Sequence, residues 1–128
     1  MKTDMSPFAI EDTIRKRLST RYKTALVRKR LEIADGVRAE FDIASQDGHI
    51  LGQIKSSRPS RKGKRKGKIR KQTQFGDLSR DCLVLAAKKE AKIRLFVLTD
   101  KTMYREFVKS ALCKAAKVLG VETILEPV

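Results

Sequence analysis

Apolar residues recur at helical spacing in three segments of the chain. In the first, Ile10, Ile14 and Leu18 form one stripe, and Ser6 with Pro7 provides a favourable helix start. A second helix is expected from within residues 72–77 to about residue 89, with an inner face of Leu78, Cys82, Leu85 and Ala86. A third, long helix is expected from Thr102 to a cap at Gly120, with inward residues Phe107, Val108, Ala111, Ala115, Val118 and Leu119.

Strand-like segments lie between these helices. Residues 25–31 are expected to form a first strand, 93–99 a strand covered on both faces, and 121–125 a short last strand. Asp47-Gly48 separates two more strand-like runs within residues 37–57, which is the strongest short-range signal for a hairpin. The order α-β-β-β-α-β-α-β predicts an α/β fold with a mixed central β-sheet flanked by helices. Residues 1–128 are expected to form a single domain.

The Asp-Gly turn also predicts which residues of the hairpin face each other. With this turn the numbers of paired residues sum to 95, so Asp42 lies opposite Gln53 and Glu40 opposite Lys55. Because side chains alternate along a strand, these four are expected on one face. The other face takes the apolar residues Phe41, Ile43, Ile50 and Ile54. The polar face has two interpretations, a reactive site or a solvated surface with cross-strand ion pairs.

The distribution of charge favours a nucleic-acid partner. The net charge is +15, and the segment 58–71 holds nine basic residues and no acid: Arg58, Arg61, Lys62, Lys64, Arg65, Lys66, Lys68, Arg70 and Lys71. This segment contains Gly and Pro and almost nothing apolar, so a flexible basic loop is expected, with Gln72 and Gln74 beyond it as further DNA contacts or as turn and capping residues. The chain has no Trp and two Tyr, so contact with a duplex backbone is favoured over stacking of unpaired bases.

The remaining composition excludes several classes of protein. No stretch reaches the roughly 18 uninterrupted apolar residues of a membrane span, and the N-terminus lacks an apolar signal core, so a cytoplasmic protein is expected. Cys82 and Cys113 lack zinc-site or disulfide spacing and are expected to be buried free thiols. His49, the only histidine, is expected on the surface.

The hairpin residues and the order of elements resemble the PD-(D/E)xK nuclease superfamily. Members of that family carry an acid on the first helix, an aspartate on the second strand and (D/E)-x-Lys on the third. Asp42 matches the strand-two aspartate, Gln53 the second acidic position and Lys55 the lysine, and Glu11 is the candidate helix acid. The resemblance covers nearly the whole chain and implies a restriction-endonuclease-like fold. Gln53 departs from it, because an acid is expected there.

Hydrolysis of a phosphodiester explains why these residue types belong together. Mg²⁺ lowers the pKa of bound water and neutralises charge on phosphorus, and it prefers a few oxygen ligands. Asp42 is the expected principal ligand, with Glu11 direct or through water, the Gln53 side-chain oxygen and the Ile54 carbonyl. Lys55 is expected to orient or deprotonate the attacking water, or to neutralise developing charge. Mn²⁺ is expected to substitute for Mg²⁺.

These expectations leave two possible functions, a DNA endonuclease and a protein that binds nucleic acid without cutting it. The enzyme would act on duplex or branched DNA as a homodimer, in junction resolution, restriction, repair or mobile-element cleavage. The alternative is a non-catalytic nucleic-acid-binding protein, either a degenerate nuclease fold or a ribosome-associated factor. This alternative explains the predicted basic loop, but it makes the placement of Asp42, Gln53 and Lys55 on one face of the hairpin a coincidence.

Overall fold

The computed structural model describes residues 6–56 and 78–127 of the chain. Its helices are α1 (Pro7–Tyr22), α3 (Lys101–Val108) and α4 (Ala111–Val118), and a further helical segment spans residues 78–87. Its strands are β1 (Leu26–Ala34), β2 (Val37–Ser45), β3 (Ile50–Lys55), β4 (Ile93–Leu98) and β5 (Val121–Leu125). The predicted basic loop at 58–71, together with Gln72 and Gln74, lies outside the described residues.

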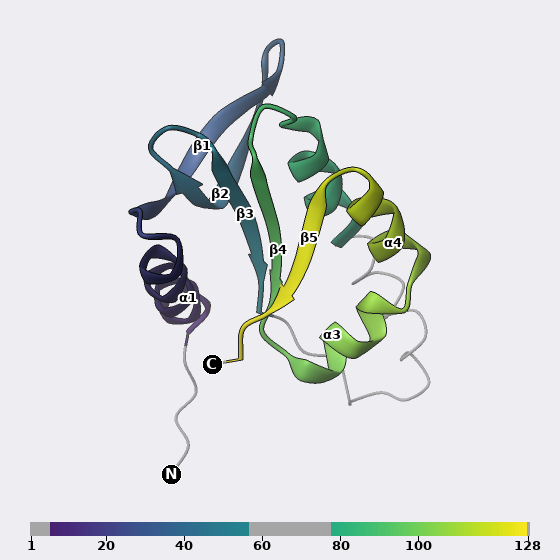
Figure 1. The fold of residues 1–128 in the computed structure, drawn as a ribbon. Helices are drawn as coiled ribbons and strands as arrows, with labels where there is room; N and C mark the ends of the chain where they lie inside the picture. Colours follow the sequence, from purple (N-terminus) through teal and green to yellow (C-terminus); the bar gives the residue numbers. More distant parts are fainter. Residues whose placement is uncertain (1–5, 57–77, 128) are drawn as a thin grey trace.

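The strands form one mixed sheet in the order β1-β2-β3-β4-β5. The pairs β1–β2 and β2–β3 are antiparallel, whereas β3–β4 and β4–β5 are parallel. Helix α1 covers one face, and the segment 78–87 with α3 and α4 covers the other (Figure 1). The predicted α/β architecture with a helix-flanked mixed sheet is therefore confirmed.

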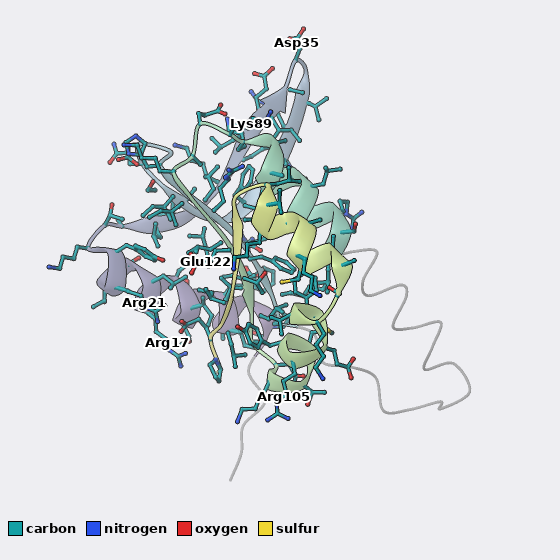
Figure 2. All side chains as sticks on the ribbon, turned by 45° about the vertical axis from the view of Figure 1, so that its right-hand side comes forward. Arg17, Arg21, Asp35, Lys89, Arg105 and Glu122 are labelled. Atoms are coloured by element: carbon teal, nitrogen blue, oxygen red, sulfur yellow. The ribbon has the colours of Figure 1, made fainter. Side chains whose placement is uncertain are left out.

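Helix α1 is fixed to the sheet by its apolar stripe and by a charged contact at the end of β5. Ile14 and Leu18 are fully buried, and Ser6 accepts a hydrogen bond from the Ala9 amide as the predicted cap. The carboxylate of Glu126 is buried and lies 3.5 Å from the Arg17 guanidinium and 2.7 Å from that of Arg21. Figure 2 shows both arginines on the side of α1 that lies toward the C-terminal end of the chain.

The predicted hairpin register is confirmed where β2 and β3 pair. Ile43 lies opposite Gly52 and Ala44 opposite Leu51, and both pairs sum to 95. Gly48 has φ 77°, a value that glycine adopts without strain. The Asp47 carboxylate accepts hydrogen bonds from the Ser45 hydroxyl and the His49 amide, which stabilise the turn. His49 is exposed, as expected.

A β-bulge at Asp42 and Ile43 makes the predicted side-chain directions wrong for the residues of β2 that precede it. Val27 pairs with Ala44 and Lys29 with Phe41, so two residues of β2, Asp42 and Ile43, face Arg28 alone. The extra residue reverses the alternation. Ile43 packs with Ile50 and Ile54 beneath α1, as predicted, but Phe41 joins the cluster under the other helices. Glu40, next to Phe41, therefore lies on the α1 side, opposite to the face of Gln53 and Lys55.

The predicted long third helix is two helices, so the order is α-β-β-β-α-β-α-α-β. Ser110 interrupts it by capping α4, with its hydroxyl accepting a hydrogen bond from the Cys113 amide. The break changes the helical phase, so Ala116 is buried whereas Val118 is 85% exposed, and the predicted inward positions hold only before the break. Gly120, with φ 91°, ends α4 as predicted.

The second predicted helix has the expected inner face. Leu78, Cys82, Leu85 and Ala86 are all buried. Both cysteines are free, but Cys113 is half-buried rather than buried. Among residues 6–56 and 78–127, no helix is long and apolar enough to cross a membrane.

Candidate functional site

Three of the predicted site residues, Asp42, Gln53 and Ile54, lie where main-chain pairing between β2 and β3 ends and side chains make the hydrogen bonds instead. Beyond the Ile43–Gly52 pair, the Asp42 Oδ2 accepts a 2.9 Å hydrogen bond from the Ile54 amide. The Gln53 Nε2 donates a 3.0 Å hydrogen bond to the Glu40 carbonyl. Two side chains thus satisfy main-chain groups that a continued ladder would have paired. The bulge in β2 is the local cause, because it turns Asp42 toward β3.

The surroundings of the Asp42 carboxyl strongly perturb its pKa. Burial raises its pKa to about 6, and the hydrogen bond from Ile54 opposes that shift. The nearby carboxylates of Glu11 and Asp81 raise the pKa further, whereas the Arg28 guanidinium lowers it. Acids from α1 and from the helical segment 78–87 therefore both act on Asp42 of β2, although they are far from it in sequence. Such mutual repulsion is the condition that a bound cation relieves.

Glu11 lies at this position because two arginines hold it. The Arg28 Nη2 donates a hydrogen bond to Glu11 Oε1, and the Arg15 Nη1 lies 3.7 Å from the same oxygen. Arg15 Nη1 also donates a 2.9 Å hydrogen bond to the Asp42 carbonyl, which ties α1 to the bulge. The side chain of Glu11 is 16% exposed. The structure thus brings the predicted helix acid close to the predicted strand acid.

Gln53 and Lys55 share the opposite face of β3 from Ile54. Gln53 is buried, and its hydrogen bond to Glu40 uses the amide nitrogen, so the amide oxygen is the atom with metal-ligand chemistry. Lys55 is the last residue of β3, is half-buried and pairs with Leu98 of β4. Ser56 follows it and is half-buried.

The donor set fits a hard divalent cation in its chemistry. Asp42 and Glu11 supply carboxylate oxygens, Gln53 an amide oxygen and Ile54 a main-chain carbonyl. Mg²⁺ keeps several waters and is commonly bound by only one or two carboxylates of the protein. Within the part of the chain that the structure describes, no group of three or more His, Cys, Asp or Glu residues is close enough to hold an ion.

Three residues of this site were missed by sequence reasoning: Arg15, Arg28 and Asp81. Arg15 follows Glu11 by four positions, a spacing that favours an ion pair on a helix, and this signal was present in the sequence. Arg28 and Asp81 reach the site only through the β2 bulge and the packing of the segment 78–87, which no local pattern encodes. Comparisons of the chain with protein-family models, curated proteins and solved structures found no match.

Proposed function

We propose that this chain is a metal-dependent DNA endonuclease of the PD-(D/E)xK type. The observation that carries the proposal is the Asp42 carboxyl, which is half-buried, bonded to the Ile54 amide and close to the carboxylate of Glu11. The Arg28 guanidinium offsets burial and the repulsion by Glu11 and Asp81 only in part, because the pKa of Asp42 remains raised, so the ionised carboxylate lacks a full counter-charge that a bound cation would supply.

The arrangement of elements supports the same proposal. The chain begins with a helix and three antiparallel strands, and a second helical segment and a parallel fourth strand follow. This is the α-β-β-β-α-β order that the resemblance implies for a restriction-endonuclease-like fold. Glu11 is on the first helix, Asp42 on the second strand, and Gln53 and Lys55 are on the third.

Asp42, Glu11, the Gln53 oxygen and the Ile54 carbonyl would hold a Mg²⁺ ion, with Mn²⁺ as a substitute. When bound, the ion would supply charge stabilisation at phosphorus and a lower pKa for the attacking water. The Ile54 amide fixes the orientation of Asp42, and Arg15 fixes the position of the Asp42 main chain. Gln53 contributes no charge, so we expect a weaker cation affinity than two strand acids would give.

Lys55 is the proposed proton-handling residue. Its position at the end of β3 puts it two residues beyond Gln53 and on the same face of the strand. As an amine it would take a proton from the attacking water, and as an ammonium it would neutralise charge that develops on the phosphate. Either role requires Nζ to lie beside the scissile phosphate.

The proposed substrate is duplex or branched DNA, because the chain carries a net charge of +15 that favours a phosphate backbone. Cutting both strands requires two such sites, so we propose a homodimer, working in the cytoplasm. Junction resolution, restriction, repair and mobile-element cleavage all match this chemistry.

One observation favours the non-catalytic alternative, a protein that only binds nucleic acid. Glu11 is already neutralised by Arg28 and Arg15, and Gln53 is bonded to the Glu40 carbonyl. In a silent site these contacts would be purely structural. The two functions differ in whether Lys55 and Gln53 affect cleavage or only binding.

Cleavage assays with variants at Lys55 and Gln53 distinguish these functions. Linear, nicked, flapped and four-way DNA are incubated with Mg²⁺, with Mn²⁺ or with chelator. The enzyme predicts metal-dependent products that Lys55→Ala abolishes and Gln53→Glu increases at low metal concentration. Lys89→Ala is the matched control, since Lys89 is exposed and lies near the opposite end of the sheet (Figure 2). Absence of products on every substrate, with DNA binding intact, would establish the alternative.

A further inference from the structure

Arg28 is a positively charged residue at the candidate site that has no role in the cleavage chemistry proposed above. It lies on the edge strand β1, opposite the two bulged residues Asp42 and Ile43. Its guanidinium bonds the Glu11 carboxylate and lies 5.3 Å from the centre of the Phe8 ring, which is 68% exposed. The Arg28 side chain is itself 33% exposed. It therefore lies at the border between the acids of the site and solvent.

Arg15 and Arg28 contact the same carboxylate in different ways. Arg15 is 14% exposed and also donates to the Asp42 carbonyl, a main-chain atom that cannot move away. Arg28 donates to the Glu11 carboxylate, which a divalent cation would also bind, and it comes from the edge strand β1. Of the two, Arg28 is the one that can change partners without disturbing the fold.

We propose that Arg28 is the phosphate-binding side chain of this site, and that Glu11 holds it in place until a divalent cation and DNA bind. The inference rests on the proposed function. A cation beside Glu11 competes with Arg28 for the carboxylate and repels the guanidinium. A phosphate oxygen of the DNA backbone then becomes its partner, in the paired geometry for which a guanidinium is suited.

This exchange makes metal and DNA binding favour each other. Phosphate that draws Arg28 away from Glu11 releases the carboxylate for the cation, and the cation releases Arg28 for phosphate. Thermodynamic linkage requires the two effects to be equal. Replacing Arg28 should therefore have opposite effects on the two ligands, which removal of a purely structural residue would not produce.

Two binding measurements on the full chain test the exchange. Mn²⁺ binding is measured without DNA, and binding of a short DNA duplex is measured in Ca²⁺ across a range of salt concentrations. The variants are Arg28→Ala and Arg28→Lys. Arg30→Ala is the matched control, because Arg30 is an exposed residue of β1 that lies opposite Glu40.

In Arg28→Ala, Mn²⁺ should bind about fivefold more tightly, since a competing charge is removed. DNA should bind about tenfold more weakly, and its salt slope should fall by about one unit. Arg28→Lys keeps the charge, so its Mn²⁺ affinity should match the native chain and its DNA affinity should be intermediate. The proposal is overturned if Arg28→Ala behaves like Arg30→Ala, or if it weakens Mn²⁺ binding.

These readouts separate the inference from the proposed function. A chain that shows both binding shifts and cuts no DNA is not a nuclease, yet Arg28 is then its phosphate contact. A chain that cuts DNA, with Arg28→Ala equal to Arg30→Ala in both binding measurements, is a nuclease in which Arg28 has no such role.

Discussion

Replacing Asp42 by Asn should make the protein more stable at neutral pH. The carboxyl is ionised in the unfolded chain above its ordinary pKa of 3.8, but burial delays ionisation in the folded chain to about pH 6. Holding the ionised form therefore costs folding free energy. Asparagine retains an oxygen that can accept the Ile54 hydrogen bond, so the substitution removes the charge and keeps the contact.

The size and the pH dependence of the effect follow from the same shift. A difference of about two pKa units corresponds to roughly 3 kcal/mol, and partial access of solvent to Asp42 reduces this to about 1.5 kcal/mol. Between the two pKa values the folded chain binds more protons than the unfolded chain, so stability falls as pH rises through this window. The cost is fully present above about pH 6 and disappears below 3.8.

Urea unfolding of the native chain and Asp42→Asn, in chelator at several pH values, measures this difference. The variant should be more stable at pH 7.5 by about 1.5 kcal/mol, and the gap should close as the pH falls toward 4. Asp47→Asn is the control of opposite sign, because hydrogen bonds from Ser45 and His49 lower the pKa of Asp47. An Asp42→Asn variant that is equally or less stable at pH 7.5 would show that the ionised Asp42 carboxylate does not destabilise the folded chain.

Three other predictions concern packing, helix capping and the basic segment 58–71. Gly52→Ala should cost about 1–3 kcal/mol in urea unfolding, because a Cβ there would lie 3.0 Å from both Ile43 Cδ1 and the Leu95 carbonyl; an unchanged midpoint would contradict this. Ser110→Ala should cost about 1 kcal/mol by removing the α4 cap, and an unchanged stability would argue for one continuous helix. Replacing Lys62, Lys64, Arg65 and Lys66 of the basic segment 58–71 by neutral residues should lower the salt slope of DNA binding by about one unit for each phosphate contact that is lost. An unchanged slope would exclude backbone binding by these four residues.

Sequence patterns predicted the parts of the fold that depend on neighbouring residues. The Asp47-Gly48 turn sets the β2–β3 register. A slip of one residue would move every side chain of one strand to the other face of the sheet, so the apolar pattern permits only one register. The stripe of Ile14 and Leu18 and the cap at Ser6 define α1 for the same local reason.

The features that depend on distant packing could not be predicted. The bulge at Asp42 and Ile43 is set by pairing with β1, so the period of β2 alone gave the wrong face for Phe41. Ser110 breaks the last helix although the apolar pattern continues across it, because a serine cap competes well with one more helical turn. In the candidate site, the proximity of Glu11 and Asp42 was expected from a resemblance. The contact of Arg28 with Glu11 was not, since Arg28 reaches it only after the sheet has formed, whereas the i,i+4 spacing of Glu11 and Arg15 is a local signal.

A cleavage assay with Asp42→Asn is the decisive test of metal-dependent nuclease activity, since this variant is expected to be at least as stable as the native chain. Both proteins are incubated with the same four-way and linear DNA over a series of Mg²⁺ and Mn²⁺ concentrations. A metal-dependent nuclease should give products with the native chain and none with Asp42→Asn, while both proteins retain DNA binding in Ca²⁺. Products from Asp42→Asn at the native rate, or none from the native chain on any DNA, would contradict the proposed function.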